Sequence, residues 1–134
     1  MTSPVWAEVE SVASHDPLFV APNDTLRHVA RTMWERSVGA LLVGRPRGLL
    51  GIISERDLAT ALARGADPDT ATAASAMSAD IVSLRPGDTL YDAGIDMLDV
   101  GIRHVPVIDD HGEVHAMVSV RDLLRPLLVR ALGG

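Results

Sequence analysis

The apolar residues of this chain form two short stripes with the same helical spacing. Residues 26–33 place them at i, i+3, i+4 and i+7, which is typical of a helix with one buried face. The same spacing returns in residues 90–97. The stripe residues are Leu26, Val29, Ala30 and Met33 in the first segment, and Leu90, Ala93, Gly94 and Met97 in the second. The pattern therefore predicts two amphipathic helices, one in each half of the chain.

Short apolar strands are expected on both sides of each of these helices. The predicted strands lie at 18–20, 40–43 and 49–53 in the first half, and at 81–84, 104–108 and 114–118 in the second. A turn rich in glycine, proline or aspartate separates the last two strands of each set, as in a β-hairpin. A second helix then runs to about Arg64 in the first half and toward Leu132 in the second. Each half is therefore predicted to be β-α-β-β-α, which is an α+β class.

The two halves are also related by sequence. Pro22-Asn-Asp-Thr-Leu26 returns 64 positions later as Pro86-Gly-Asp-Thr-Leu90, and the segment 52–58 returns 65 positions later as 117–123. A three-stranded sheet with helices on one face leaves its other face apolar, and a second copy can cover it. We expect one pseudo-symmetric pair, with residues 1–66 as the first repeat and its N-terminal helix, and residues 67–134 as the second repeat and its C-terminal helix.

Finer features of each repeat follow from local signals. Asp24 and Asp88 are the expected N-caps of the two striped helices, because a short carboxylate accepts from unpaired helix N–H groups. The segments 5–12 and 70–77 are expected to form short helices that precede the repeats, and 65–69 is the expected linker.

Composition narrows the classes of function. The chain has no cysteine, which excludes disulfides and thiolate metal sites. Its net charge of −6 argues against nucleic-acid binding, and its apolar runs are too short for a membrane span. All the negative excess lies in residues 67–134. The first residues lack a basic region ahead of an apolar stretch, so we expect no secretory signal and a cytoplasmic location.

One polar motif follows the last strand of each repeat. It reads Ser54-Glu55-Arg56-Asp57 in the first repeat and Ser119-Val120-Arg121-Asp122 in the second. Serine followed three residues later by an acid is also a helix capping box, so the motif alone has a purely structural interpretation.

Together, these motifs resemble a tandem pair of CBS (cystathionine-β-synthase) domains. The resemblance rests on the β-α-β-β-α order, the Pro-x-Asp-Thr-Leu helix start, the segment His104-Val-Pro-Val-Ile108 and the Ser-x-Arg-Asp-Leu motif. It covers roughly residues 12–128. It implies a regulatory module with two clefts between the repeats, whose ligands are AMP, ADP, ATP or S-adenosylmethionine. It also implies a homodimer, an unidentified effector protein as a further partner, no required cofactor and no enzymatic activity.

The resemblance also implies the ligand contacts. In this family the aspartate of the motif bonds ribose hydroxyls, and the serine faces ribose or phosphate. Carboxylates accept from a diol, a helix N-terminus favours phosphate, and arginine can grip phosphate, which agrees with these roles. The candidate ligand-binding residues are Ser54, Arg56, Asp57, Val82, His104, Val105, Pro106, Ser119, Arg121 and Asp122.

The repeats differ at three positions that bear on the clefts. Leu42 stands where the second repeat has Pro106, Glu55 where it has Val120, and Gly51 where it has Ala116. An added methyl at the last position could crowd a ligand that approaches the backbone closely. We therefore expect unequal clefts, of which one or both bind.

Two other classes of function are alternatives to a ligand-binding regulatory module. The same departures motivate a ligand-free scaffold that dimerises or tethers a partner through vestigial clefts. A nucleotide hydrolase would need an acidic metal pair and a positioned base, and no motif supplies either. His111 and His115 lie four residues apart across a probable hairpin, so no metal site is predicted.

Overall fold

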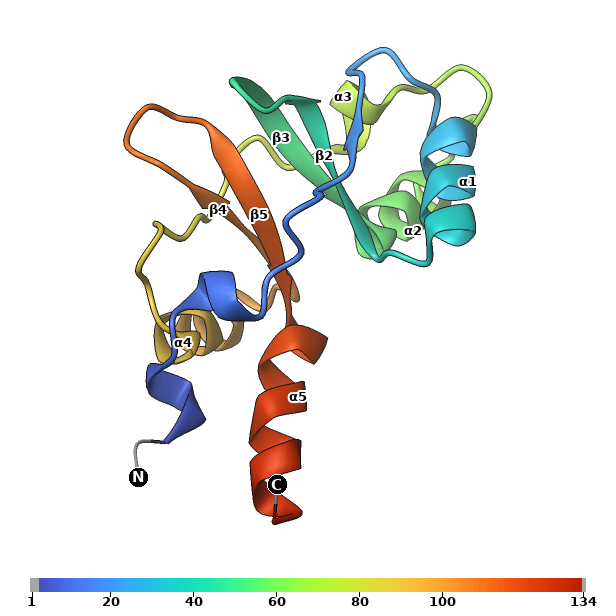
Figure 1. The fold of residues 1–134 in the computed structure, drawn as a ribbon. Coiled ribbons are helices and arrows are strands. Elements are labelled where there is room, and N and C mark those ends of the chain that lie inside the picture. Colours follow the sequence, from blue (N-terminus) through green and yellow to red (C-terminus); the bar gives the residue numbers. More distant parts are fainter. Residues whose placement is uncertain (1–2, 134) are drawn as a thin grey trace. The chain divides into compact units, whose positions relative to one another are not determined.

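The computed structural model describes residues 3–133, which form two compact units. The first-repeat unit is Leu18–Ile81. The second-repeat unit joins the residues up to Pro17 to those from Val82 onward. Both units contain helices and strands (Figure 1). The predicted α+β class is confirmed, and the predicted packing of sheet against sheet stays a prediction.

The first-repeat unit contains a three-stranded sheet. Its strands are β1 (Phe19–Val20), β2 (Ala40–Arg45) and β3 (Gly48–Ser54), and its helices are α1 (Leu26–Arg36), α2 (Glu55–Ala63) and α3 (Ala73–Ala76). β1 runs parallel to β2, and β2 pairs with β3 as an antiparallel hairpin. The elements follow the predicted order, and the hairpin strands extend one to two residues beyond the predicted ranges.

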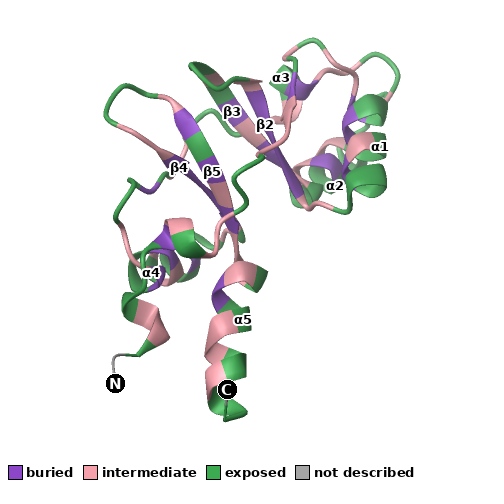
Figure 2. Ribbon diagram, in the orientation of Figure 1, coloured by how far each residue is buried: buried purple, intermediate pink, exposed green. Residues whose placement is uncertain are grey.

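The core of this unit lies between the sheet and its helices. Three residues of the α1 stripe, Leu26, Val29 and Met33, are buried, whereas Ala30 is exposed. Strand residues Leu41 and Ile53 are fully buried in the same cluster. Figure 2 shows this burial as purple bands on α1, β2 and β3. The stripe is therefore narrower than the sequence spacing predicts.

The second-repeat unit is built on a two-stranded sheet. Its elements are the 3₁₀ turns η1 (Pro4–Trp6) and η2 (Val9–Ser11), the helices α4 (Leu90–Val100) and α5 (Val120–Ala131), and the strands β4 (His104–Ile108) and β5 (Val114–Ser119). The predicted strand at 81–84 is reduced to a single parallel bridge between Leu84 and Val107. The predicted short helix at 5–12 is a pair of 3₁₀ turns, and the one at 70–77 is only the four residues of α3.

A proline explains the lost strand. In the first repeat the Leu42 N–H donates to the carbonyl of Leu18 at 3.0 Å, which extends the pairing of β1. Pro106 occupies the matching position and has no N–H to donate. Only the two hydrogen bonds around Leu84, at 2.8 Å each, remain.

The helix caps also differ from the prediction. Thr25 and Thr89, not Asp24 and Asp88, are the N-caps of α1 and α4. Each aspartate instead accepts a backbone N–H from three residues earlier, Ala21 or Arg85, at 2.8 Å. The carboxylate therefore closes the turn before the helix, and the threonine hydroxyl is left to cap it.

Each repeat is completed by the segment that precedes the other repeat in the sequence. In the first-repeat unit, Leu26 N–H donates to Ala71 carbonyl at 3.0 Å. In the second-repeat unit, Leu90 N–H donates to Ala7 carbonyl at 2.9 Å in the same way. The units therefore do not coincide with 1–66 and 67–134, because residues up to Pro17 belong with the second repeat. The repeat boundaries themselves stay a prediction.

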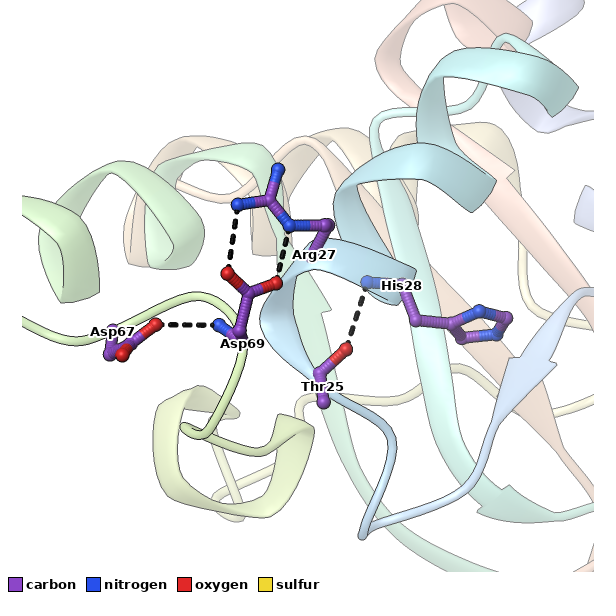
Figure 3. A network of polar contacts seen from close by, with 5 residues as sticks. All are labelled: Thr25, Arg27, His28, Asp67 and Asp69. Carbon is purple, nitrogen blue, oxygen red and sulfur yellow. Dashed lines mark hydrogen bonds and ion pairs between the residues drawn. The ribbon is translucent and has the colours of Figure 1, made fainter.

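An ion pair connects the linker, residues 65–69, to α1 in the first-repeat unit. The Arg27 guanidinium donates to both carboxylate oxygens of Asp69, with Nη2 to Oδ2 at 3.1 Å (Figure 3). Asp67 accepts the Asp69 N–H at 2.9 Å, and Arg27 N–H donates to Pro68 carbonyl at 2.9 Å. The ion pair raises the pKa of Arg27 and lowers the pKa of Asp69. The segment that leads into α3 is therefore held against the start of α1.

Among the described residues, no helix is long and apolar enough to cross a membrane.

Candidate ligand-binding site

The first motif forms a capping box at the start of α2. Ser54 Oγ accepts the Asp57 N–H at 3.2 Å, and Asp57 Oδ2 accepts the Ser54 N–H at 2.8 Å and the Ser54 hydroxyl at 3.0 Å. Ser54 ends β3 and Asp57 is the third residue of α2, so the strand-to-helix turn fixes both side chains. Both are partly buried.

The second motif repeats this geometry at the start of α5. Asp122 Oδ2 accepts the Ser119 N–H at 2.8 Å, and Ser119 Oγ accepts the Asp122 N–H at 3.3 Å. In both motifs the backbone bond of the aspartate goes to Oδ2, and the cap does not use Oδ1. Each partly buried aspartate can therefore cap its helix and still accept a hydrogen bond through Oδ1.

The helix ends offer fewer free N–H groups than the sequence predicts. Glu55 N–H donates to Gly39 carbonyl at 3.0 Å, and Val120 N–H donates to Arg103 carbonyl at 2.9 Å. The serine cap uses a further N–H in each first turn. The amide of the arginine, Arg56 or Arg121, is therefore the N–H left for an anion at each helix start. Both arginine side chains are exposed.

A third capping box lies outside the motif and shows which features of the motif are due to helix capping alone. At the start of α4, Asp92 Oδ2 accepts the Thr89 N–H at 2.9 Å, and Thr89 Oγ1 accepts the Asp92 N–H at 3.2 Å. This box lies outside the Ser-x-Arg-Asp motif and has the same geometry. The capping geometry therefore carries no argument for a ligand, and Asp92 serves as a matched control for the motif aspartates.

The remaining candidate residues fall into two groups within the second-repeat unit. His104 lies directly opposite Ser119 in the β4–β5 register, which brings it beside the second motif. Pro106, two residues along, shares that face of the sheet. Val105 is instead fully buried in the hydrophobic core of the unit and can offer a ligand only backbone atoms, whereas Val82 is partly buried against that core.

The two motifs have different neighbours across their hairpins. Ala40 lies opposite Ser54 in the first-repeat unit, where the second-repeat unit has His104 opposite Ser119. An imidazole beside one motif and a methyl group beside the other give the two places different polarity. The difference between Ala40 and His104 is a structural reason to expect that the two sites are unequal.

The difference between Gly51 and Ala116 has another cause than the one predicted. A Cβ at Gly51 would lie 2.6 Å from Met77 Sδ and 2.6 Å from the Ser78 carbonyl oxygen. The glycine therefore admits the segment that leads out of α3, which pairs with β3 through Ile52. In the second repeat the small Ala13 occupies the place of Met77 and packs against the same core as Ala116. The absence of a side chain at Gly51 therefore makes room for Met77 and Ser78 rather than for a ligand.

A groove that the sequence did not reveal begins at the first motif. It has a volume of about 550 Å³ and lies between α2 and the α3 segment. Its polar lining is Asp57 and Thr60 from α2, Arg64 at the C-cap of that helix, and Ser75 from α3. The sequence feature that indicates this groove is the i, i+3, i+7 spacing of Asp57, Thr60 and Arg64, which places polar groups on one side of the helix.

The β4–β5 hairpin gathers a cluster of titratable groups. Asp109, Glu113 and His115 each bring one possible ligand atom within 4.8 Å of the others, and His111 is not part of this group. Asp109 Oδ1 accepts the N–H groups of His111 and Glu113, and Oδ2 lies 2.7 Å from His115 Nε2. The His115 contact lowers the pKa of Asp109 to about 2 and raises the pKa of His115. The Asp109 carboxylate therefore holds the two ends of the β4–β5 turn together.

Comparison with curated proteins finds relatives that span most of the chain. A protein of Acidianus ambivalens is 34% identical over 90% of this chain and 73% of its own length. Hypoxic response protein 1 of Mycobacterium tuberculosis is 32% identical over 84% of this chain and 80% of its own length. A protein of Methanopyrus kandleri is 30% identical, and the chain spans 65% of it. An inosine-5'-monophosphate dehydrogenase of Nitrosopumilus maritimus is 26% identical, and the match covers 23% of it.

Solved structures share the fold. The CBS domain protein PAE2072 from Pyrobaculum aerophilum, complexed with AMP, has a TM-score of 0.83 and 25% identity, and covers 96% of this chain and 100% of its own. The CBS domain pair of MJ0100, in complex with 5'-methylthioadenosine and S-adenosylmethionine, has a TM-score of 0.81 and 25% identity, and covers 89% and 98%. The family model described as CBS domain matches residues 9–64 and 73–129. The chain therefore belongs to the CBS domain family, with two copies in tandem.

Proposed function

We propose that this chain is a regulatory module that binds an adenosine-containing ligand at its Ser-x-Arg-Asp motifs. The observation that carries the proposal is that both repeats place the same Ser-x-Arg-Asp motif at a strand-to-helix turn with a partly buried aspartate, whereas Asp92 of the third capping box is exposed. Asp57 and Asp122 are each fixed by their helix cap, and in each the cap leaves Oδ1 unused. A fixed acceptor loses little conformational entropy when it accepts a ribose hydroxyl. The complexes of related CBS domain proteins with AMP and with S-adenosylmethionine support this ligand class.

The chemistry of the motif suits binding rather than turnover. A carboxylate accepts from a ribose hydroxyl, the amide of Arg56 or Arg121 can donate to a phosphate, and the arginine side chain adds a positive charge. The proposal therefore includes no catalysis and no required cofactor. AMP, ADP, ATP and S-adenosylmethionine are the candidate ligands. They are cytoplasmic metabolites, so the proposal includes a cytoplasmic location.

Thermal denaturation with a panel of these ligands tests the proposal. A ligand at one hundred times its dissociation constant should stabilise the chain by about 2.7 kcal/mol. The informative variants are Asp57→Asn and Asp122→Asn. Asparagine keeps one oxygen to accept the cap hydrogen bonds, but its NH₂ group cannot accept from a ribose hydroxyl. An alanine variant would lose the cap as well and confuse the two effects.

The control is Asp92→Asn, which makes the same change in a capping box outside the motif. We expect the ligand-induced shift to survive in Asp92→Asn, to weaken in one motif variant and to vanish in the double motif variant. If no candidate ligand shifts the transition, or if the double variant responds like the wild type, the proposal is wrong.

We further propose that the output passes through a second copy of the chain or an effector protein. Leu124, Leu128 and Leu132 recur every four residues at the C-terminal end, and they are 47%, 56% and 88% exposed. Such an apolar stripe favours a protein interface. Light scattering after size-exclusion chromatography should show a homodimer that Leu128→Glu weakens. A monomer at micromolar concentration would leave only the effector as the partner of this face.

A ligand-free scaffold is the second candidate. The third capping box at Thr89 favours it, because it shows that the motif geometry forms without a ligand. It predicts dimerisation that is unaffected by any adenosyl ligand and by either motif variant.

A further inference from the structure

The helices α1 and α4 occupy matching places in the two repeats, and each exposes large apolar side chains. Trp34 of α1 is 83% exposed, and Leu98, 64 positions later on α4, is 81% exposed. Leu98 continues an exposed stripe with Tyr91 and Ile95. The ring of Trp6, also exposed, packs against Tyr91 with the ring centroids 5.3 Å apart. Exposed apolar surface of this kind favours a protein partner.

The two helices carry opposite charge. The sequence of α1 contains three arginines and one glutamate, whereas that of α4 contains three aspartates and no basic residue. Partial burial, together with the charges of Asp88, Asp92 and Asp99, raises the pKa of Asp96. The carboxylates of α4 are therefore crowded, and a cation from a partner would relieve their repulsion.

The basic charge of α1 lies at the surface. Arg27 is held by Asp69, and Arg31 and Arg36 are exposed. Arg31 occupies the position that matches Ile95 of α4, one turn of helix before Trp34. The outer face of α1 thus combines a basic and an aromatic side chain.

The helices next to α1 and α4 differ in the size of their exposed side chains. α2 packs beside α1, and α5 packs beside α4. Leu124 and Leu128 are exposed on α5, and 65 positions earlier α2 exposes Ala59 and Ala63. The second-repeat unit therefore presents large side chains where the first-repeat unit presents small ones.

Charge and size distinguish the ways in which two copies can pair through these faces. Pairing α4 with α4 would bring two sets of three aspartates together, and pairing α1 with α1 would bring two sets of arginines together. Like charges that face each other across an interface weaken it, whereas opposite charges favour it. Pairing α1 with α4 joins opposite charges and sets the leucines of α5 against the alanines of α2. This pairing is complementary in both respects.

We propose that two copies of the chain associate head to tail, with the α1–α2 face of one copy on the α4–α5 face of the other. A two-fold axis makes this contact twice and closes the assembly as a dimer. The inference rests on the homodimer proposed above and adds which faces form it. It does not depend on a bound ligand.

Charge reversal tests the pairing in the full chain. Sedimentation velocity over a range of concentrations measures the dissociation constant of the dimer for the wild type, Arg31→Glu, Asp99→Arg and the variant with both changes. Both residues are exposed, so the core is left intact. Arg45→Glu, at the exposed end of β2, makes the same change in net charge outside these helices and is the matched control. Arg45→Glu combined with Asp99→Arg restores the net charge but not the contact.

We expect each single reversal on α1 or α4 to weaken the dimer by about 10- to 30-fold, because an exposed charge contact is altered twice in each dimer. The variant with Arg31→Glu and Asp99→Arg should recover the affinity of the wild type, because the opposite charges are exchanged rather than lost. Arg45→Glu should have no effect and should not rescue Asp99→Arg. The wild-type dimer should weaken as salt is added.

Other outcomes overturn the inference in distinguishable ways. A dimer that Asp99→Arg strengthens would indicate α4 paired with α4, and the head-to-tail arrangement would be wrong although the homodimer stands. A dimer in which the double variant is no tighter than the single variants would also exclude pairing of α1 with α4. A wild-type chain that stays monomeric would refute both the homodimer and its arrangement, whereas ligand binding at the motifs would still be judged by the thermal shifts.

Discussion

Substitution of Gly51 by alanine tests how closely the two segments around it pack. The added Cβ would lie 2.6 Å from Met77 Sδ and 2.6 Å from the Ser78 carbonyl oxygen. Ordinary contacts of a Cβ begin near 3.4 Å, so both atoms must move by about 0.8 Å. The Met77 side chain can rotate, because it is flexible. The Ser78 carbonyl cannot move freely, because it accepts the Ile52 N–H at 3.0 Å.

The size of the effect follows from this contact. Overpacking of a buried site costs about 1–3 kcal/mol in the free energy of unfolding. With an unfolding entropy of about 2.1 cal/mol/K per residue, that corresponds to a fall in Tm of about 4–11 °C for a chain of this length. Urea denaturation followed by circular dichroism measures the free energy, and a thermal scan measures Tm.

Gly48→Ala is the matched control, since Gly48 begins the same strand. A Cβ there would meet its nearest atom, Arg45 Cβ, at 4.0 Å, and the backbone is not left-handed. We expect this variant to lie within about 0.5 kcal/mol of the wild type or to be slightly more stable. Met77→Ala added to Gly51→Ala should recover part of the loss, because it removes one of the two close contacts. If Gly51→Ala is as stable as Gly48→Ala, the account of this position is refuted.

Two further predictions concern polar contacts. Thr89→Ala removes the hydroxyl cap of α4 and should lower the free energy of unfolding by about 0.5–2 kcal/mol in urea denaturation; no change would show that the Asp92 half of the box suffices. The pKa of Asp109 falls from 3.8 to about 2 in the folded chain, so its contribution to stability is present above pH 3.8 and is lost as the pH falls toward 2. The pKa of His115 rises above 6.5, so its contribution is present below pH 6.5 and is lost as the pH rises through the raised value. The difference in Tm between wild type and Asp109→Asn should therefore be largest between about pH 4 and 6.5. A difference that does not vary with pH would show that the contact between Asp109 and His115 does not stabilise the folded chain.

The sequence predicts the elements of this fold well, because their signals are local. The stripe from Leu26 to Met33 and the hairpin turns identify helices and strands without reference to the rest of the chain. The lost strand near Leu84 was also encoded, in the missing N–H of Pro106, but its effect depends on which residue that N–H would have faced. The pairing of residues across neighbouring strands depends on the tertiary structure, not on the local sequence.

The exchange of flanking segments could not be predicted from the sequence. Ala71 and Ala7 show no local feature that assigns them to a repeat, and only their hydrogen bonds to Leu26 and Leu90 reveal the assignment. Gly51 was misinterpreted for the same reason: its neighbour Met77 comes close only once the α3 segment pairs with β3.

The local structure of the motif residues was predicted from the sequence, and their role in binding a ligand stays a prediction. The motif residues Ser54, Asp57, Ser119 and Asp122 are held as a helix cap in both repeats, as the capping-box interpretation expects. The groove beside Asp57 was missed, because one wall of it belongs to the segment around Ser75, which lies distant in the sequence. A polar face on one helix is visible in a sequence, whereas the wall opposite it is not.

The central claim is that the motif aspartates accept ribose hydroxyls. A crystal structure of the chain grown with AMP tests it most directly. The account predicts nucleotide density with a ribose hydroxyl about 2.6–3.0 Å from Oδ1 of Asp57 or Asp122, while Oδ2 keeps the cap hydrogen bonds. Nucleotide bound away from both aspartates, or none bound while each carboxylate serves only its helix cap, would contradict it.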